Sequence, residues 1–301
     1  MKNIVIESPL SLKKTVKKYD EFLVSDICEK YREYGVDVSS YFRGLSQIDL
    51  YECTQTGYRF YWPLRVVGDA KFYENLSTNK TNYYSNRWEH QIALSKLSKK
   101  DKTLEVGSGF GAFLKLLNEN NIIAKGLELN PHAVKQCKKN GFDVEEKLVQ
   151  TEAKDYKGLY DAVCYFQVLE HIAEVHSFVS ASVALLKKGG KLIIGVPNNN
   201  PYLFINDKYH TLNLPPHHAG LWNKKSLLSL QDLFGLKLDY IEFEPLDVSY
   251  NYFIKFHQKN GGNKLSKYIL KILHKKTPKL LQKILCSMIK GRNVLVVFKK
   301  L

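Results

Sequence analysis

The feature that most constrains the fold is a regular alternation, from residue 101 onward, of short apolar runs with amphipathic stretches. The runs are rich in Val, Ile and Leu, as are strands buried on both faces of a sheet. They predict strands at 103–106, 124–129, 161–166, 191–196, 236–243 and 294–298, and the stretches between them predict helices at 111–120, 131–139, 174–187 and 223–234. Strands that alternate with helices form a mostly parallel sheet, so we expect a doubly wound α/β fold.

The segments that flank this alternation are expected to form separate parts of the chain. Apolar residues at helical spacing over 11–36 predict an amphipathic helix that ends at Gly35. Short strands around a bend at Gly57 are predicted within 45–63, followed by a helix over 84–98. The expected division is an N-terminal appendage (1–80), a core (81–245 plus 291–301) and an insert before the last strand (246–290).

Positive charge is concentrated at the C-terminal end of the 301 residues. From Val248 to Leu301 there are thirteen basic residues and no acidic one, whereas the first 247 residues hold 32 basic and 30 acidic residues. A partner that responds to charge is therefore expected to bind this end of the chain.

The cysteines and the apolar runs exclude several protein classes. The five cysteines are scattered without a C-x-x-C pair, which argues against a disulfide framework and a four-cysteine zinc site. The start turns polar too early for a secretory signal, and no apolar run is long enough to span a membrane. We expect a cytoplasmic protein, soluble or peripheral on the inner membrane face.

The most informative motif is L-E-V-G-S-G-F-G-A-F at 104–113, where a predicted strand leads through three glycines into a predicted helix. Glycine is required where the chain turns with positive φ or where a ligand meets the backbone closely. The motif differs from the dinucleotide fingerprint G-x-G-x-x-G, because Gly111 comes one residue early and Glu105 precedes the first glycine by two. An acid is unfavourable beside a pyrophosphate, but it suits an ammonium group.

A second acid, Glu128, ends the next predicted strand in G-L-E-L-N-P. An acid in this place suits hydrogen bonds to a ribose diol. Adenosine joined to an amino acid describes S-adenosylmethionine, which we therefore expect as the cofactor. The alternative is that the glycines only make a tight connection between strand and helix.

The glycine run and Glu128, together with three later segments, resemble the class I S-adenosylmethionine-dependent methyltransferases. The later segments are Y-D-A-V-C-Y-F-Q-V-L-E-H-I (160–172), L-L-K-K-G-G-K-L-I-I-G-V-P-N (185–198) and P-P-H-H (215–218). The likeness covers about residues 80–245 plus the last strand, and is greatest to a branch that often modifies small molecules and sugars in bacterial cell-surface pathways. It implies a seven-stranded doubly wound sheet whose final, antiparallel strand is V-L-V-V-F at 294–298.

The resemblance also implies the cofactor-binding residues. Glu105, Gly107, Ser108, Gly109 and Gly111 would surround the methionine end, Glu128 the ribose and Leu129 the adenine, with Gln167 beside the cofactor and Tyr84 and Arg87 as candidates for its carboxylate.

Three histidines are the candidates for catalysis. Methyl transfer depends on positioning and, where the nucleophile carries a proton, on a base, for which histidine is suited near neutral pH. His171 follows the strand at 161–166, and His217 and His218 follow the strand at 191–196. Because ligands bind beyond the carboxyl ends of such strands, we predict that at least one of the three lines the acceptor pocket. Glu170 could orient His171 or satisfy nearby backbone N–H groups.

No metal is expected in the N-terminal appendage. Members of the resembling branch can carry a zinc-binding module with paired cysteines in this part of the chain. Here Cys53 has no second cysteine nearby, and Cys28 is too isolated to complete a site. Residues 40–75 are therefore interpreted as a metal-free relic of that module or as an unrelated cover for the cofactor cleft.

The insert contains a basic amphipathic segment at 263–290, in which Pro278 is expected to separate two helices. It could form a helical hairpin that closes over the core. Alternatively, it could attach to an anionic surface such as phospholipid or a polyprenyl-diphosphate-linked glycan. Nucleic acid is an unlikely partner, because no helix-turn-helix, zinc-finger or RNA-binding signature accompanies the charge.

We therefore expect methyl transfer from S-adenosylmethionine to a small-molecule or glycan-linked acceptor, at oxygen, in a bacterial cell-surface polysaccharide pathway. The alternatives are C- or N-methylation of a nucleotide sugar, or a non-catalytic cofactor-binding assembly partner.

Overall fold

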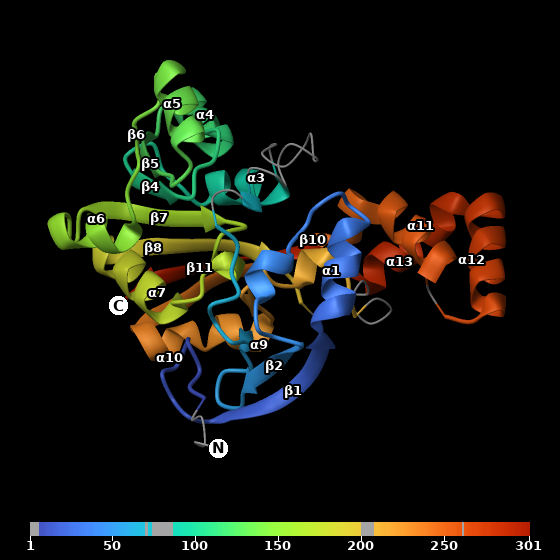
Figure 1. Cartoon of the computed structure of the whole chain (residues 1–301). Coiled ribbons are helices and arrows are strands. Elements are labelled where there is room, and N and C mark those ends of the chain that lie inside the picture. Colours follow the sequence, from blue (N-terminus) through green and yellow to red (C-terminus); the bar gives the residue numbers. More distant parts are fainter. Residues whose placement is uncertain (1–5, 70–71, 74–86, 200–207, 261) are drawn as a thin grey trace.

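A computed structural model describes residues 6–69, 72–73, 87–199, 208–260 and 262–301 (Figure 1). Its centre is a seven-stranded sheet in the order β10-β11-β8-β7-β4-β5-β6. Strands β4 to β8 are parallel neighbours, whereas β11 is antiparallel to both β8 and β10, as predicted. The strands are β4 (Lys102–Val106), β5 (Ile123–Leu127), β6 (Val144–Glu145), β7 (Tyr160–Phe166), β8 (Leu186–Pro197), β10 (Leu236–Pro245) and β11 (Lys290–Lys300).

Helices cover both faces of this sheet, because alternate strand residues point to opposite sides. Cys164 and Phe166 of β7 pack with α3 (Trp88–Ser95) and α4 (Ala112–Glu119). Val163 and Tyr165 pack on the other side with α7 (Val175–Leu185). The remaining core helices are α5 (Pro131–Lys139), α6 (Val149–Asp155), α9 (Lys224–Leu228) and α10 (Leu230–Phe234), so the predicted helix at 223–234 is interrupted at Ser229. The doubly wound α/β prediction is confirmed.

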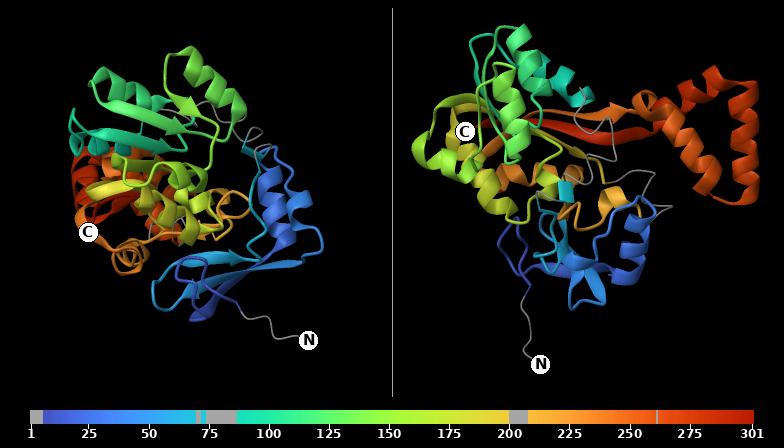
Figure 2. Two further views of the ribbon diagram at one scale, coloured as in Figure 1. Left: turned by 90° about the vertical axis from the view of Figure 1, so that its left-hand side faces the viewer. Right: turned by 45° about the horizontal axis from the view of Figure 1, so that its top comes forward.

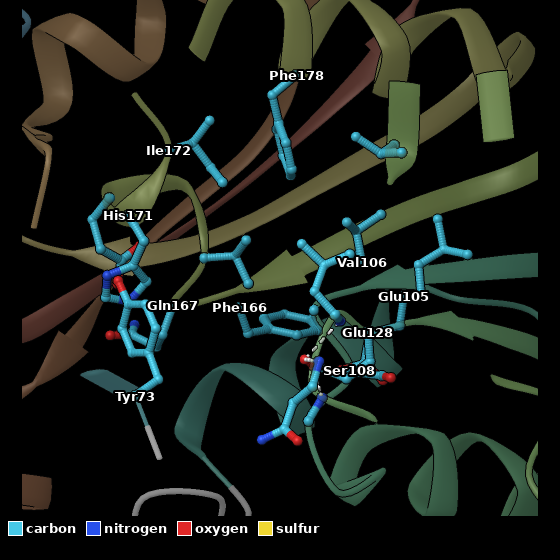
Figure 3. Close-up of a pocket in the computed structure, with 18 of the residues that line it drawn as sticks. Tyr73, Glu105, Val106, Ser108, Glu128, Phe166, Gln167, His171, Ile172 and Phe178 are labelled. Carbon is cyan, nitrogen blue, oxygen red and sulfur yellow. Dashed lines mark hydrogen bonds and ion pairs between the residues drawn. The ribbon is translucent and has the colours of Figure 1, made fainter. Parts of the chain in front are cut away.

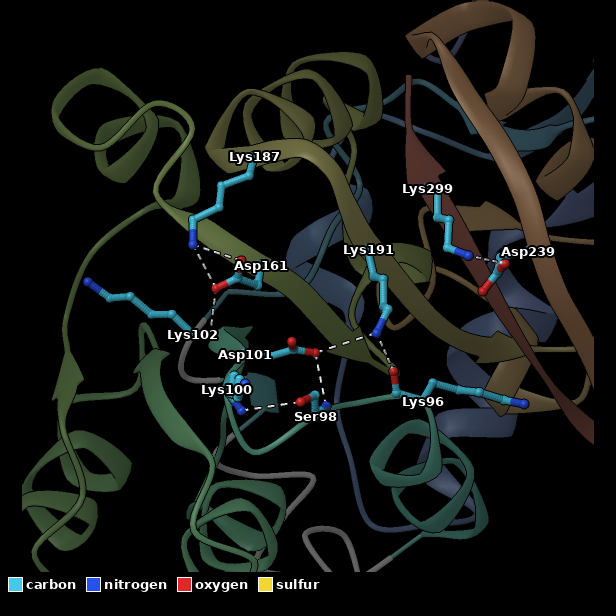
Figure 4. Close-up of polar contacts among 10 residues, drawn as sticks. All are labelled: Lys96, Ser98, Lys100, Asp101, Lys102, Asp161, Lys187, Lys191, Asp239 and Lys299. Carbon is cyan, nitrogen blue, oxygen red and sulfur yellow. Dashed lines mark hydrogen bonds and ion pairs between the residues drawn. The ribbon is translucent and has the colours of Figure 1, made fainter.

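Ion pairs and hydrogen bonds lie at the end of the sheet where the parallel strands begin (Figure 4). The Asp161 carboxylate accepts hydrogen bonds from the Lys187 ammonium at 2.7 Å and from the Lys102 backbone N–H at 2.9 Å. Lys299 pairs with Asp239 at 2.7 Å on the antiparallel strands. Such partly exposed pairs contribute little each. The end of the sheet at which the parallel strands begin is therefore a polar surface. The parallel strands finish at the opposite end.

The predicted helix over 11–36 is wrong in its first half. Residues Val16–Leu23 form strand β1, and only Val24–Arg32 form a helix, α1. Strand β1 pairs antiparallel with β2 (Gln47–Cys53), which itself pairs with β3 (Arg59–Trp62). Pairing with a distant strand overrides the local helical spacing of the apolar residues.

Strand β9 (Gly220–Leu221) joins the chain after β8 to this N-terminal sheet, whose order is β1-β2-β3-β9. The connection was not predicted, because a two-residue strand leaves no periodic pattern. The described part of the body also contains short 3-10 helices: η1 (Ser39–Phe42), η2 (Leu169–His171) and η3 (Thr211–Asn213).

The insert forms an arm that extends away from the body (Figures 1 and 2). It consists of η4 (Leu246–Ser249), α11 (Tyr250–Asn260), α12 (Lys264–Lys276) and α13 (Pro278–Met288). The predicted break at Pro278 is confirmed, whereas the hairpin folded over the core is not the observed arrangement. The arm has a small apolar core of its own, which includes Phe253, Ile254 and Leu281. Among the described residues, no helix is long and apolar enough to cross a membrane.

Candidate active site

A cavity of about 980 Å³ lies at the edge of the sheet where β4, β5 and β7 end (Figure 3). Parallel strands bring the loops that follow them to one edge, so the glycine turn, Glu128 and Gln167 share this cavity. Of the predicted site residues, those that line it are Glu105, Gly107, Ser108, Gly109, Glu128, Leu129, Gln167, Arg87, His171, His217 and His218. Gly111 is not among the lining residues, and Tyr84 lies outside the described residues.

The glycine turn needs its glycines for two different reasons. Gly107 has φ +74°, and a Cβ there would lie 2.5 Å from the Val168 side chain. Its backbone N–H donates to the Leu127 carbonyl at 2.7 Å, which ties the turn to β5. Gly111 has φ +80° at the start of α4, and a Cβ there would meet Phe142 at 2.9 Å. Gly107 therefore shapes the cavity wall, whereas Gly111 allows α4 to pack.

Glu105 is a buried acid on β4 whose side chain is 4% exposed. Its Oε2 atom has no hydrogen-bond partner, although it lies at the cavity wall. Burial and the nearby Glu128 raise the pKa of this carboxyl well above its usual range. An orphaned buried carboxyl costs free energy unless a cationic group meets it. The site thus fits a ligand with an ammonium group, as the sequence predicted.

Glu128 joins the loops that follow β4 and β5. One carboxylate oxygen accepts the Gly109 N–H at 2.8 Å. The other accepts the N–H groups of Leu129 at 2.9 Å and Asn130 at 2.8 Å. These bonds fix the carboxylate at the cavity wall, and sequence reasoning did not foresee them because each depends on the folded backbone.

Gln167 is held in a conformation that non-glycine residues rarely adopt, with φ +56°. Its side-chain amide donates to Glu89 at 2.8 Å and to Asn293 at 3.3 Å, and its backbone N–H donates to the Gly195 carbonyl at 2.7 Å. Such strain persists where the surroundings over-determine it, commonly at ligand sites. Glu89 and Asn293 belong to α3 and β11, and their role was missed because no local sequence signal joins them to Gln167.

The three predicted histidines lie together at the cavity wall. The ring of His171 lies 5.0 Å from the rings of both His217 and His218, measured between centroids, and the latter two are 4.6 Å apart. His171 Nδ1 lies 2.6 Å from the His217 carbonyl oxygen, which also accepts the Tyr73 hydroxyl at 3.1 Å. Tyr73 is a contact that the sequence did not indicate.

Burial sets the charge state of this cluster. It lowers the pKa of His171 to about 4, so the ring is neutral near pH 7. It also raises the pKa of the adjacent Glu170 to about 8. Glu170 Oε1 is 3.9 Å from His171 Nε2, which is too long for a hydrogen bond. The His217 carbonyl, rather than Glu170, therefore orients the His171 ring.

Comparison with known proteins identifies the fold of the site. Residues 81–241 match the model of a methyltransferase domain family. The chain belongs to this family. It is a class I S-adenosylmethionine-dependent methyltransferase, and the glycine turn, the orphaned Glu105 carboxyl and Glu128 are the residues that would hold the cofactor. When bound, S-adenosylmethionine supplies a methyl group activated by its sulfonium charge.

Several relatives and solved structures are similar to this methyltransferase. A ubiquinone biosynthesis O-methyltransferase of Pseudomonas fluorescens is 27% identical over 179 residues, which cover 51% of this chain and 77% of the relative. The protein of the same name from Saccharophagus degradans is 25% identical over 217 residues, covering 64% and 88%. A methyltransferase structure from Archaeoglobus fulgidus is 18% identical, with a TM-score of 0.47, and covers 77% of this chain and 95% of that one.

Proposed function

We propose that this methyltransferase modifies a hydroxyl oxygen of a small-molecule or glycan-linked acceptor in a bacterial cell-surface polysaccharide pathway. The observation that carries the proposal is the division of one cavity into two chemically different sides (Figure 3). Glu105, Ser108 and Glu128 lie at one side, where the cofactor is expected, and His171 lies at the other with Tyr73. A hydroxyl acceptor has a proton to lose, and imidazole is the side chain suited to accept or hold it.

The relatives favour oxygen as the methylated atom, since those compared here are named O-methyltransferases. Their names also support a second candidate acceptor, a hydroxyl compound of ubiquinone biosynthesis. Both candidates place a hydroxyl beside the histidines, and they differ in what carries it: a sugar ring or a precursor of a quinone.

The test is incubation of the purified chain with methyl-labelled S-adenosylmethionine and three acceptor sets: free sugars, a lipid-linked glycan fraction, and phenolic quinone precursors. Mass spectrometry of the labelled product identifies the methylated atom. A methyl ether on a sugar supports the proposal, and one on a phenol selects the second candidate. A methylated carbon or nitrogen overturns both, as does cofactor binding without any labelled product, which would indicate a non-catalytic assembly partner.

We also infer that the arm attaches the enzyme to an anionic membrane surface. On α12, Leu265, Ile269 and Leu273 recur every four residues and are between 40% and 64% exposed. On α13, Leu280, Ile284 and Met288 repeat this arrangement with 47% to 76% exposure. Lysines lie beside these exposed apolar stripes, and the sequence has no acidic residue after Asp247. The lysines suit anionic headgroups, and the apolar stripes suit the acyl chains beneath them. An acceptor linked to a lipid would be found at that surface.

Co-sedimentation with liposomes tests the attachment. Each lysine near the surface contributes about 1 kcal/mol, and screening sets in over about 8 Å at physiological ionic strength. Binding should therefore grow with the fraction of anionic lipid and fall with salt. The double substitution Lys271→Glu with Lys275→Glu should abolish it, whereas the matched control Lys99→Glu with Lys100→Glu, on the exposed surface of the body, should not. Equal binding to neutral liposomes, or none to either kind, would overturn the inference.

A further inference from the structure

The acceptor side of the cavity contains an unusual concentration of imidazole. His217 and His218 are each 4% exposed, and His171 completes the group from η2. One potential ligand nitrogen from each ring lies within 4.8 Å of the other two. Within the ranges that the structure describes, no second group of histidine, cysteine or acidic side chains meets this condition. We propose that His171, His217 and His218 bind a divalent transition-metal ion of the zinc class.

The spacing of the rings matches what one ion requires. A tetrahedral zinc ion binds imidazole nitrogens at about 2.1 Å, which places the centroids of its rings roughly 5 Å apart. The three centroid distances here are 4.6, 5.0 and 5.0 Å. The ligand nitrogens lie within 4.8 Å of one another and would need to approach to about 3.4 Å, the separation that a tetrahedral ion imposes.

The hydrogen bonds around the rings support the same conclusion. A histidine ligand usually donates its second ring N–H to a carbonyl or carboxylate, which leaves the other nitrogen for the metal. His171 Nδ1 lies 2.6 Å from the His217 carbonyl oxygen, a position from which the N–H donates and Nε2 remains to coordinate. The Ala219 N–H donates to the Glu170 carbonyl at 2.8 Å, which ties the segment carrying His217 and His218 to η2.

Glu170 is the second, independent observation. Its carboxyl group is 1% exposed, its Oε2 atom has no hydrogen-bond partner, and its Oε1 atom lies 3.9 Å from His171 Nε2. A buried carboxyl of this kind is costly unless a positive charge is near. Arg87 is one such charge, and a divalent ion held by the three imidazoles would be a second.

Three protein ligands would leave one position for a further ligand, and all three histidines line the cavity. Imidazole ligands select zinc, cobalt, nickel or iron(II) over magnesium and calcium, which prefer oxygen. The fourth ligand would be the oxygen of a hydroxyl acceptor, an assignment that rests on the proposed function. The ion would hold and polarise this oxygen. The scattered cysteines predicted no metal site, whereas the three histidines come together only in the fold.

The test is metal binding by the full chain, stripped with a chelator and then titrated with Zn²⁺ or Co²⁺. We expect one ion per chain and a visible Co²⁺ absorption spectrum typical of tetrahedral nitrogen ligands. His217→Ala with His218→Ala should abolish both. Glu170→Gln, which preserves volume but removes the acidic group, should weaken binding about ten-fold, because one favourable charge near the ion is lost. The exposed surface variant His132→Ala should bind as the wild type does, and calorimetry with S-adenosylhomocysteine verifies that each variant is folded.

Binding by the double histidine variant equal to that of the wild type would overturn the inference, as would a wild-type chain that binds less than one ion. The result is separable from the proposed function. Methylation of a hydroxyl by a metal-free chain would overturn the metal site alone. Stoichiometric metal binding without a methylated hydroxyl would support the site and overturn the proposed acceptor.

Discussion

Glu128 offers the sharpest test of how this enzyme holds its cofactor. In the substitution Glu128→Ala, the carboxylate that accepts three backbone N–H groups within 2.9 Å is removed. The predicted ribose contact is removed with it. Hydrogen bonds to a charged group contribute about 1.5–3 kcal/mol, so the affinity for S-adenosylmethionine and S-adenosylhomocysteine should fall roughly ten- to a hundred-fold.

Two effects could produce this loss, and they are separable. The loops after β4 and β5 could separate, because Glu128 no longer joins them, or the ribose could lose its hydrogen bonds to the carboxylate. Calorimetry with S-adenosylhomocysteine and its 2′-deoxy analogue distinguishes them. The wild type should bind the deoxy analogue about ten-fold more weakly than the parent compound, since one charged hydrogen bond is lost. Glu128→Ala should bind both ligands equally, because the group that distinguishes them is gone.

Glu119→Ala is the matched control, because Glu119 is an exposed acid at the far end of α4. It should bind both ligands as the wild type does. The assignment of Glu128 to the ribose would be refuted if Glu128→Ala stayed within two-fold of the wild type. It would also be refuted if the variant still distinguished the two ligands.

Three further predictions concern the glycine turn, the histidines and pH. Gly107→Val should weaken cofactor binding at least a hundred-fold, as measured by calorimetry, because the valine side chain would collide with Val168. Gly158→Val is the control: Gly158 also has a positive φ, +64°, but a side chain there would meet no atom, so cofactor binding should be unchanged. Replacing His171, His217 or His218 in turn with Gln should leave cofactor affinity within a few fold, and at least one replacement should lower turnover about a hundred-fold. Normal turnover by all three variants would exclude these histidines as the base. Burial lowers the pKa of His90 to about 4 from 6.5. The contribution of the neutral His90 ring to the free energy of unfolding is therefore fully present above pH 6.5 and is lost as the pH falls towards 4. Urea unfolding should show that the free energy of unfolding falls between pH 7 and pH 5 by about 2 kcal/mol less in His90→Phe than in the wild type. An equal fall in both proteins would contradict this prediction.

The parallel core could be predicted because its signals are local. A few consecutive residues suffice to predict a buried strand or an amphipathic helix, and the glycine turn lies between one such strand and the helix that follows it. The positions of Glu105 and Glu128 around one cavity followed from the motif and its spacing, whereas the place of Gln167 was implied by the family resemblance. The convergence of His171 with His217 followed from the strands that precede them.

The rest depended on contacts between distant segments. Strand β1 was mistaken for a helix because its pairing with β2 lies outside its own sequence window. The bonds of Gln167 to Glu89 and Asn293 join residues 78 and 126 positions apart. The direction of the arm could not be predicted either, since an amphipathic pattern shows which face of a helix is apolar but not what that face contacts.

The pairing of strand β9 with the N-terminal sheet indicates which segments of the chain could determine acceptor selectivity. The segment that carries His217 and His218 continues into this strand, which is part of the N-terminal sheet. The Tyr61 hydroxyl donates to the Asn213 carbonyl at 2.6 Å, and the Tyr31 hydroxyl to the Leu214 carbonyl at 3.0 Å. The wall of the cavity that we propose binds the acceptor is thus held in place by residues outside the parallel strands of the core. Exchanging residues 6–73 together with 208–222 between related enzymes should transplant selectivity as a module, while exchanging either piece alone should leave a mismatched wall.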